Sequence, residues 1–282
     1  MLRLKQIFRD TKCAVIGMIH AGALPGEVQI TSTPLYCGDI QKVLDDACRE
    51  AECYASSHVD GVMIENMNDI PYVQAKHLGP EITATMTQIC CKVRQILQPT
   101  PCGVQVLAGG NREAVAVAHA AGLQFVRAEG FVFSHVADEG FTDASAGVLF
   151  RYRRNIGANN VLVFTDIKKK HSSHAITSDV GIEDTARSAE FFCSDGVIIT
   201  GTATGQPAEL SELSAVKKVC TGPVLVGSGV TIENVTDYLQ ADAVIVGTHF
   251  KHGGKWQNQV DGNRVKLFMN KMCEARLMAE KI

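Results

Sequence analysis

The sequence predicts a single (β/α)8 TIM barrel of the α/β class over residues 1–282, with an N-terminal helix closing its bottom. Short apolar runs alternate eight times with segments of helical period. Barrels of this kind typically contain about 250 residues, so a chain of 282 residues fits one domain. No Gly-x-Gly-x-x-Gly turn follows the first strand, which disfavours the open doubly wound sheet.

The predicted strands are apolar, often β-branched, and too short for helices. In chain order they are Ala14–Met18, Gly61–Ile64, Val104–Leu107, Phe125–Ala128, Val161–Thr165, Gly196–Thr200, Val224–Val226 and Val244–Val246. Helical periodicity predicts Ile40–Tyr54, Ile82–Leu97, Glu113–Ala121, Ala144–Asn155, Ile182–Phe192, Leu210–Val219, Ile232–Leu239 and a closing helix Val260–Ala279. The basic segment Met1–Asp10 is predicted to close the barrel bottom, and part of a mitochondrial transit peptide is the alternative.

Composition narrows the class of partner. The chain is 46% hydrophobic and 20% charged, and none of its apolar runs is long enough for a membrane span. A net charge of −3 gives no basic excess for nucleic acid. Ten cysteines without a Cys-x-x-Cys pair indicate reduced thiols. We therefore expect a cytoplasmic protein, with the mitochondrial matrix as the alternative, and leave a homo-oligomer open.

The most informative motif lies in the last two predicted strands. Pro223–Val235 and Ala243–His249 each contain a buried strand that ends in glycine, and Thr231 is predicted to cap a helix between them. Adjacent strand ends present backbone N–H groups side by side, an arrangement that suits phosphate. The predicted phosphate-binding residues are Gly227, Ser228, Gly229, Gly247 and Thr248, with His249 and Lys251 as charges at the rim.

Polar residues at the other strand ends supply the remaining candidates, since barrel chemistry lies there. The predicted catalytic residues are His20, Glu65, Asp166, Lys168, Lys170 and His171, and the predicted substrate-binding residues are Asn66, Arg127, Glu129, Thr200 and Gly201. A carboxylate such as Glu65 after an apolar strand must be paired, metal-bound or catalytic. His20 has structural packing as its alternative role, and Arg127 with Glu129 an internal salt bridge.

The fifth strand end carries the densest charge. Asp166, Lys168 and Lys170 share one side if the strand stays extended. A lysine among other cations has a depressed pKa and can act as base, electrophile or Schiff-base nucleophile, whereas a solvated basic loop is the alternative. No cofactor is firmly predicted and no metal ligand is assigned. His171 and His174 leave a divalent metal open, with Glu65, Asp166 and His20 as alternative ligands.

Five segments together resemble the BtpA/SgcQ family over nearly the whole chain. They are Met18–Gly26, Glu65–Pro71, Asp166–His171, Val197–Pro207 and Val226–Val235. The resemblance implies a fold similar to the ribulose-phosphate-binding TIM barrels. The family's cyanobacterial namesake is associated with photosystem I accumulation, and the genes of other members lie beside sugar-uptake genes. The resemblance therefore implies a fold but hardly any specific activity. Ala128 and Glu129 depart from the expected Arg-Val-Asn pattern, which puts the substrate specificity in doubt.

Two functions are consistent with these residues. The first is an enzyme of lyase or isomerase type that acts on a small phosphorylated, sugar-phosphate-like metabolite by proton transfer, isomerisation or aldol-type chemistry. Glu65, Asp166 and Lys170 would face the reacting carbons, together with His20. The second is a non-catalytic assembly or stability factor of a larger complex, which an apolar patch outside the mouth would favour. Charged residues in the predicted mouth favour the enzyme.

Overall fold

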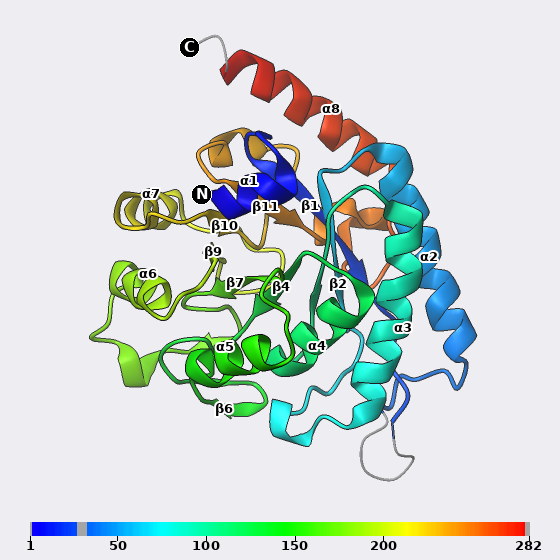
Figure 1. Cartoon of the computed structure of the whole chain (residues 1–282). Coiled ribbons are helices and arrows are strands. Elements are labelled where there is room, and N and C mark those ends of the chain that lie inside the picture. The colour runs from blue at the N-terminus through cyan, green and yellow to red at the C-terminus, as the bar shows by residue number, and fades with distance from the viewer. Residues whose placement is uncertain (1, 27–32, 280–282) are drawn as a thin grey trace.

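The fold is a closed parallel barrel, described here from a computed structural model over residues 2–26 and 33–279. Its strands are β1 (Ala14–His20), β2 (Gly61–Glu65), β3 (Cys102–Gln105), β4 (Phe125–Ala128), β7 (Leu162–Asp166), β9 (Gly196–Ile199), β10 (Val224–Val226) and β11 (Ala243–Val246). They close in the order β1-β11-β10-β9-β7-β4-β3-β2 (Figure 1). The predicted barrel is confirmed. Met1, residues 27–32 and residues 280–282 of the predicted domain lie outside the described residues.

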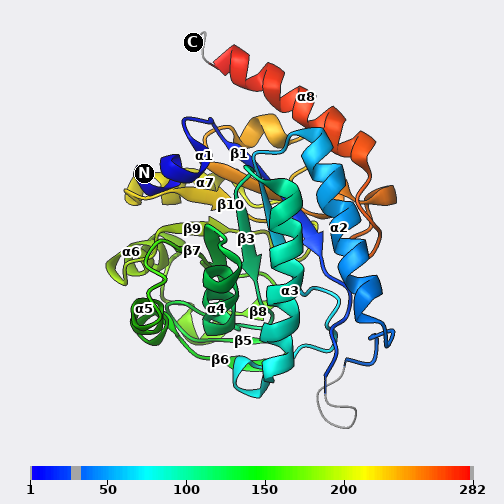
Figure 2. The same ribbon diagram turned by 45° about the vertical axis from the view of Figure 1, so that its right-hand side comes forward.

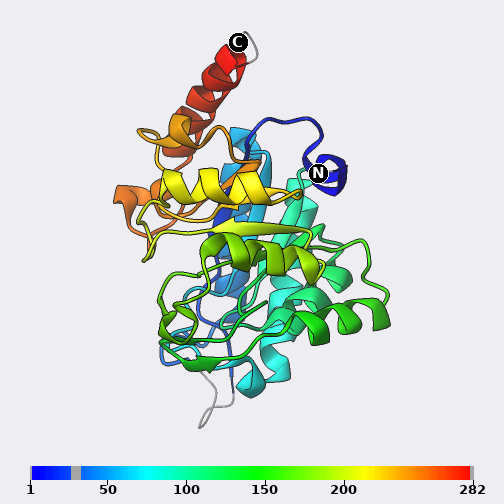
Figure 3. The ribbon, with the colours of Figure 1, turned by 90° about the vertical axis from the view of Figure 1, so that its left-hand side faces the viewer.

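Helices surround the strands on the outside. They are α2 (Ile40–Ser57), α3 (Pro80–Leu97), α4 (Asn111–Ala121), α5 (Ala146–Asn155), α6 (Ile182–Phe191), α7 (Leu210–Val219) and α8 (Gly262–Ala279). Figure 2 shows α2 and α3 side by side along one flank, and Figure 3 shows the end of α8 standing clear of the barrel. Across the described ranges, every helix falls short of the length and apolarity that crossing a bilayer requires.

Alternating side chains divide the core into two parts. Along β1, Val15 and Ile19 face outward into the cluster that packs under the helices. Ile16 and Met18 face inward and fill the barrel interior. This separation follows from the period of two along a strand.

The N-terminal helix α1 (Leu2–Phe8) closes the barrel bottom as predicted. Leu4 and Phe8 belong to the cluster that fills the barrel interior. The ring centroid of Phe8 lies 5.8 Å from that of Phe125. A Cβ on Gly61, the first residue of β2, would lie 2.6 Å from the Phe8 ring, so the helix packs directly against the N-terminal end of the strand.

Aspartates at the barrel bottom fix the starts of three strands. Each precedes a strand and accepts a hydrogen bond of 2.8–3.0 Å from the backbone N–H of the neighbouring strand: Asp60 from Val15, Asp195 from Val163 and Asp242 from Val224. Each also pairs with a cation, namely Arg276, Arg153 and Lys217 respectively. These bonds satisfy N–H groups at the strand starts and help to set the relative heights of the strand ends above.

The connection between β10 and β11 differs from the prediction. The α-helix expected over Ile232–Leu239 is reduced to one 3-10 turn, η3 (Val235–Tyr238). Asn234 provides the reason, since its Oδ1 accepts from Thr231 N at 2.8 Å and its Nδ2 donates to Gly229 O at 3.0 Å. The side chain thereby holds a tight turn in place of a helical first turn. The predicted capping of an α-helix by Thr231 is wrong.

A small antiparallel sheet lies among the loops that follow β4 and β7. It consists of β5 (His135–Ala137), β6 (Gly140–Thr142) and β8 (Ser172–Ser173), in the order β6-β5-β8. Four short 3-10 helices lie in other connections, namely η1 (Ala75–His77), η2 (Ala175–Thr177), η4 (Thr248–Phe250) and η5 (His252–Gly254). Asp138 therefore lies in the turn of a hairpin, and β5 of this hairpin pairs with the segment after β7.

Candidate active site

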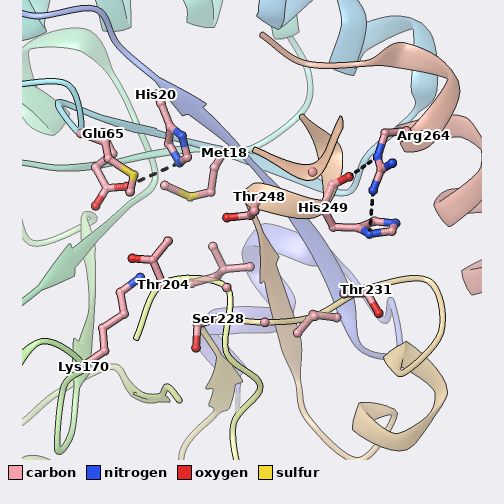
Figure 4. Close-up of a pocket in the computed structure, with 18 of the residues that line it drawn as sticks. Met18, His20, Glu65, Lys170, Thr204, Ser228, Thr231, Thr248, His249 and Arg264 are labelled. Carbon is pink, nitrogen blue, oxygen red and sulfur yellow. Dashed lines mark hydrogen bonds and ion pairs between the residues drawn. The ribbon is translucent and has the colours of Figure 1, made fainter. Parts of the chain in front are cut away.

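A cavity of about 370 Å³ lies at the C-terminal ends of β1, β10 and β11 (Figure 4). It gathers many of the predicted site residues, namely His20, Glu65, Arg127, Lys170, Gly227, Ser228, Gly229, Gly247 and Thr248. These residues come from strands far apart in the sequence whose ends the barrel brings together. This cavity, which we call the first cavity, therefore lies at the face of the barrel where the strand-end glycines are predicted to meet.

The ends of β10 and β11 form one wall, which we call the anion cup: Gly227, Ser228, Gly229, Gly247 and Thr248. The N–H of Gly227 continues the barrel ladder by donating to Ile199 O at 2.8 Å. Within the described ranges, the next two amides, of Ser228 and Gly229, donate to no protein acceptor. Two adjacent N–H groups at a strand end suit the oxygens of an anion.

Glycine is required at position 229 by both conformation and space. Its φ of +64° is in the left-handed region, which favours glycine. A Cβ there would collide with the backbone of Gln206 and Pro207. Consequently a side chain at this position would disturb the cup itself.

Thr200 and Gly201 support the cup from behind, and neither lines the cavity. The hydroxyl of Ser228 accepts from Gly201 N at 2.7 Å and donates to Gln206 O at 2.9 Å. Thr200 Oγ1 accepts from Lys170 N at 3.1 Å. In this structure both residues hold the loops that carry Ser228 and Lys170.

Arg264 on α8 supplies positive charge beside the cup and was missed by the sequence analysis. Its Nε donates to His249 O at 2.6 Å, its Nη2 lies 3.3 Å from His249 Nδ1, and both side chains line the cavity (Figure 4). Burial, followed by the charge of Arg264, lowers the pKa of His249. Lys251, expected at the rim, is instead fully buried with its Nζ 2.9 and 2.8 Å from the two carboxylate oxygens of Glu50.

Glu65 and His20 lie next to each other at one side of the cavity (Figure 4). Burial raises the pKa of Glu65. Burial, together with the charge of Lys251, lowers the pKa of His20 to about 3. Nδ1 of His20 lies 3.1 Å from the carbonyl oxygen of Trp256, so Nδ1 carries the ring proton and Nε2 is an acceptor. Nε2 lies 3.9 Å from Glu65 Oε2, and the contact joins a neutral ring to a carboxyl group.

The three consecutive lysines point to different places. The chain leaves the extended conformation after Asp166, and Lys168 has a φ of +49°. Lys168 Nζ donates to Thr177 O at 3.0 Å, and Lys169 Nζ pairs with Glu129 Oε1 at 3.3 Å. The expectation that Asp166, Lys168 and Lys170 share one side is therefore wrong.

Lys170 is the lysine of this run that reaches the cavity (Figure 4). In the part of the chain that the structure describes, its Nζ makes no hydrogen bond or ion pair with a protein group. Burial, followed by the charge of Arg127, lowers the pKa of Lys170. An amine of lowered pKa without a protein acceptor is available to a ligand.

Arg127 and Asp166 form a buried pair. Arg127 Nε lies 3.0 Å from Asp166 Oδ2, and Arg127 Nη2 lies 2.9 Å from Oδ1. Asp166 lies outside the lining of the first cavity, which Arg127 reaches. The internal salt bridge considered between Arg127 and Glu129 is replaced by this pair and by the bond between Glu129 and Lys169.

Two further candidates are engaged with the backbone. Asn66 is fully buried, its Oδ1 accepting from Leu107 N at 2.7 Å and its Nδ2 donating to Leu107 O at 3.2 Å. It clamps a loop and lines neither main cavity. His171 Nε2 accepts from Thr204 N at 3.1 Å, which ties the loops after β7 and β9 together. Among the described residues, no group of three or more His, Cys, Asp or Glu side chains is arranged to hold a metal ion.

A second cavity of about 260 Å³ adjoins the first. Glu65, Met67, Arg127, Lys170 and Thr204 line both cavities. We call the second cavity the distal lobe, and its remaining walls are Tyr72, Gln105, Leu107, Ala108, Glu129, Asp138, Glu139, Lys169, His171 and Trp256. The barrel mouth is thus a two-part site with Lys170 at the junction.

Comparison with known proteins identifies close relatives over most of the chain. Residues 11–274 match the model of the BtpA family. An uncharacterized mitochondrial protein of Caenorhabditis elegans is 46% identical over 270 residues, which cover 94% of this chain and 95% of the relative. The photosystem I biogenesis protein BtpA of a Synechocystis species is 30% identical over 269 residues, covering 94% and 90%.

Solved structures share the fold at much lower identity. Orotidine 5′-monophosphate decarboxylase from Methanocaldococcus jannaschii gives a TM-score of 0.58 at 13% identity, covering 93% of this chain and 99% of that chain. Thiamine phosphate pyrophosphorylase from Pyrococcus furiosus gives 0.55 at 12% identity, covering 98% and 99%. The barrel therefore resembles those of enzymes named for phosphorylated compounds.

Proposed function

This chain belongs to the BtpA family, and from that premise we propose that it is an enzyme acting on a small phosphorylated metabolite, with the phosphate in the anion cup and the reaction beside Glu65 and Lys170. One observation carries the proposal. The amides of Ser228 and Gly229, unpaired among the described residues, line the same cavity as the buried carboxyl group of Glu65 and the half-buried amine of Lys170, both of shifted pKa. Such groups gather at catalytic sites more often than elsewhere.

The cup binds phosphate through backbone N–H groups and the adjacent charge of Arg264. Since these groups are fixed by Gly229 and by the bonds of Ser228, they need little reorganisation on binding. Binding energy at the phosphate holds the other end of the molecule against the reacting groups. Phosphate recognition therefore serves catalysis by positioning.

Glu65 and Lys170 are the proposed proton-transfer pair. Burial raises the pKa of Glu65 and lowers that of Lys170, which brings the proton affinities of the two groups closer together. His20 presents the unprotonated Nε2 toward Glu65 and orients its carboxyl group. This arrangement suits isomerisation or proton abstraction next to a carbonyl group, and an aldol-type reaction through an imine of Lys170 is the variant.

Two residues act through their neighbours in this scheme. Asp166 positions Arg127, and His171 positions the loop of Thr204, so neither touches the reacting carbons. Solved barrels of similar fold with names such as orotidine 5′-monophosphate decarboxylase support a phosphorylated substrate. They support it through fold alone, since the identity is 13%.

Thermal denaturation with inorganic phosphate, ribose 5-phosphate and unphosphorylated ribose tests the proposal. A ligand that binds the folded state raises the melting temperature. We expect both phosphate compounds to raise it and ribose to leave it unchanged. If neither phosphate compound stabilises the protein at millimolar concentration, the cup does not bind phosphate and the proposal fails.

A second candidate function is an assembly or stability factor. Two adjacent aromatic rings favour it, since Phe191 and Phe192 at the end of α6 are 82% and 48% exposed, outside the barrel mouth. The name of the Synechocystis relative, a photosystem I biogenesis protein, indicates such a role for that protein. The buried charged groups of the mouth have no use in such a role, and for that reason we favour the enzyme.

The compartment proposed first, on composition, is the cytoplasm. The name of the C. elegans relative favours the mitochondrial alternative. Helix α1 is part of the barrel, because Phe8 packs in its interior. Imaging of the full chain carrying a C-terminal fluorescent tag decides between the two compartments, since overlap with a matrix marker would exclude the cytoplasm.

A further inference from the structure

The distal lobe differs in character from the anion cup. Aromatic and aliphatic side chains form much of its wall, namely Met67, Tyr72, Leu107, Ala108 and Trp256. A sugar phosphate of hydroxyl groups alone would leave this apolar surface without a matching partner. The lobe therefore favours a ligand that carries a flat, apolar group in addition to the phosphate and its polar linker.

The two aromatic walls are held in place by the protein. The hydroxyl group of Tyr72 donates to Met67 O at 2.7 Å. The carbonyl oxygen of Trp256 accepts from His20 Nδ1 at 3.1 Å, and the His20 and Trp256 rings meet edge to face at 6.4 Å. Fixed aromatic side chains bind planar rings at low entropic cost.

Gln105 gives the lobe a buried polar group without a partner among the described residues. Gln105 at the end of β3 is 2% exposed, and within the described ranges its Oε1 has no hydrogen-bond partner. Three charged groups of the lobe are engaged with one another, since Lys169 pairs with both Glu129 and Glu139. Buried polar groups are nearly always hydrogen-bonded, so an unpaired carboxamide beside a cavity indicates a ligand with a polar edge.

We propose that the distal lobe binds a planar nitrogen heterocycle whose N–H and C=O edge pairs with Gln105, so that the ligand joins such a ring to the phosphate through a sugar-sized spacer. This inference rests on the proposed function and narrows its substrate class. A cavity of about 150 Å³ holds benzene, and the lobe of about 260 Å³ is larger. Lys170, at the junction of the two cavities, lies beside the spacer.

Trp256 provides a direct readout, because it is the only tryptophan in the chain. The experiment titrates the protein with uridine 5′-monophosphate, inosine 5′-monophosphate, ribose 5-phosphate and uridine. Tryptophan emission is excited at the red edge of its absorption, and melting temperature is followed in parallel. Trp256→Phe serves as the fluorescence blank.

We expect at least one nucleotide to bind more than about tenfold tighter than ribose 5-phosphate and to change the emission of Trp256. Gln105→Leu should abolish this advantage and leave ribose 5-phosphate binding unchanged. Gln88→Leu, on the exposed side of α3, is the matched control and should behave as the wild type. Leucine fills a similar volume, so Gln105→Leu should keep the fold, which the unliganded melting temperature checks.

The outcomes separate this inference from the proposed function. If the nucleotides bind no tighter than ribose 5-phosphate and the emission stays constant, the heterocycle is excluded and the phosphate site stands. If uridine alone changes the emission and no phosphate compound stabilises the protein, the heterocycle site stands and the phosphate site is excluded. Absence of any response excludes both.

Discussion

Arg127 on β4 and Asp166 at the end of β7 form a bidentate pair inside the barrel mouth, with N–O distances of 2.9 and 3.0 Å and side chains 4% and 1% exposed. A buried guanidinium that loses its carboxylate is left uncompensated. The pair thus holds Arg127 at the wall that both cavities share.

Asp166→Asn should lower the free energy of unfolding by about 3 kcal/mol, because breaking one side of a buried ion pair typically costs about 3–5 kcal/mol and the amide keeps part of the hydrogen bonding. Denaturant titration measures the loss. Asp184→Asn removes the same charge from an exposed pair with Arg187 on α6 and should cost less than about 0.5 kcal/mol. Equal effects of the two substitutions would contradict a stabilising role for the buried pair.

Lys170→Met should abolish turnover of a phosphorylated substrate while the protein remains folded. The amine of Lys170 faces the cavity without a protein acceptor, and a group that takes part in proton transfer contributes about 10²–10⁴-fold to the rate. Lys168→Met is the matched control, since Lys168 donates to Thr177 O away from this cavity. Borohydride trapping with a carbonyl substrate, followed by peptide mapping, separates an imine mechanism from proton transfer. Full activity in Lys170→Met would exclude Lys170 from the chemistry.

Arg264→Gln should weaken phosphate binding without changing the fold. Replacing a charge-assisted contact by a neutral one should weaken binding by about tenfold, since hydrogen bonds to charged groups are worth about 1.5–3 kcal/mol. Titration calorimetry with ribose 5-phosphate measures the effect. Arg151→Gln on the exposed side of α5 is the control, because Arg151 bonds only to Gly147 O of its own helix among the described contacts. The cup assignment fails if the two variants bind the ligand equally well.

The barrel and the meeting of the strand-end glycines at one cavity could be predicted because both leave local signals. Strands show as short apolar runs, and the strand-end glycines at positions 227 and 247 mark where the chain turns at the mouth. The direction of the lysines could not be predicted. A period of two holds only while a strand continues, and β7 ends at Asp166.

Long-range contacts account for the other differences. Arg264 reaches the cup from the C-terminal helix, and Lys251 is buried against Glu50 of α2, so their environments depend on residues far away in the sequence. Asn234 replaces a helical turn by its own side-chain bonds, which a helical periodicity cannot reveal. Local patterns therefore place strand ends, whereas tertiary contacts decide which side chains reach the ligand.

His20 should make stability fall below neutral pH. Its folded pKa is lowered from 6.5 to about 3, first by burial, so between these values the unfolded chain binds a proton that the folded protein excludes. The stabilising contribution is complete above the unfolded pKa and declines as the pH falls from 6.5 toward 3. Glu65 has the opposite effect on the pH dependence of stability. Because its pKa is raised in the folded protein, the folded protein keeps this proton to a higher pH than the unfolded chain does, and the contribution of Glu65 to stability falls as the pH rises.

Comparing the wild type with His20→Asn isolates the histidine, since Glu65 and the other histidines remain in both proteins and Asn Nδ2 can donate to Trp256 O in place of the ring. Between about pH 7.5 and about pH 5.5, the wild type should lose about 1.4 kcal/mol more unfolding free energy than the variant, one pKa unit being worth about 1.4 kcal/mol. Denaturant titrations at the two pH values measure this difference. Parallel losses in both proteins would mean that His20 takes up its proton in the folded state, and Nε2 would then be a donor toward Glu65 and not an acceptor.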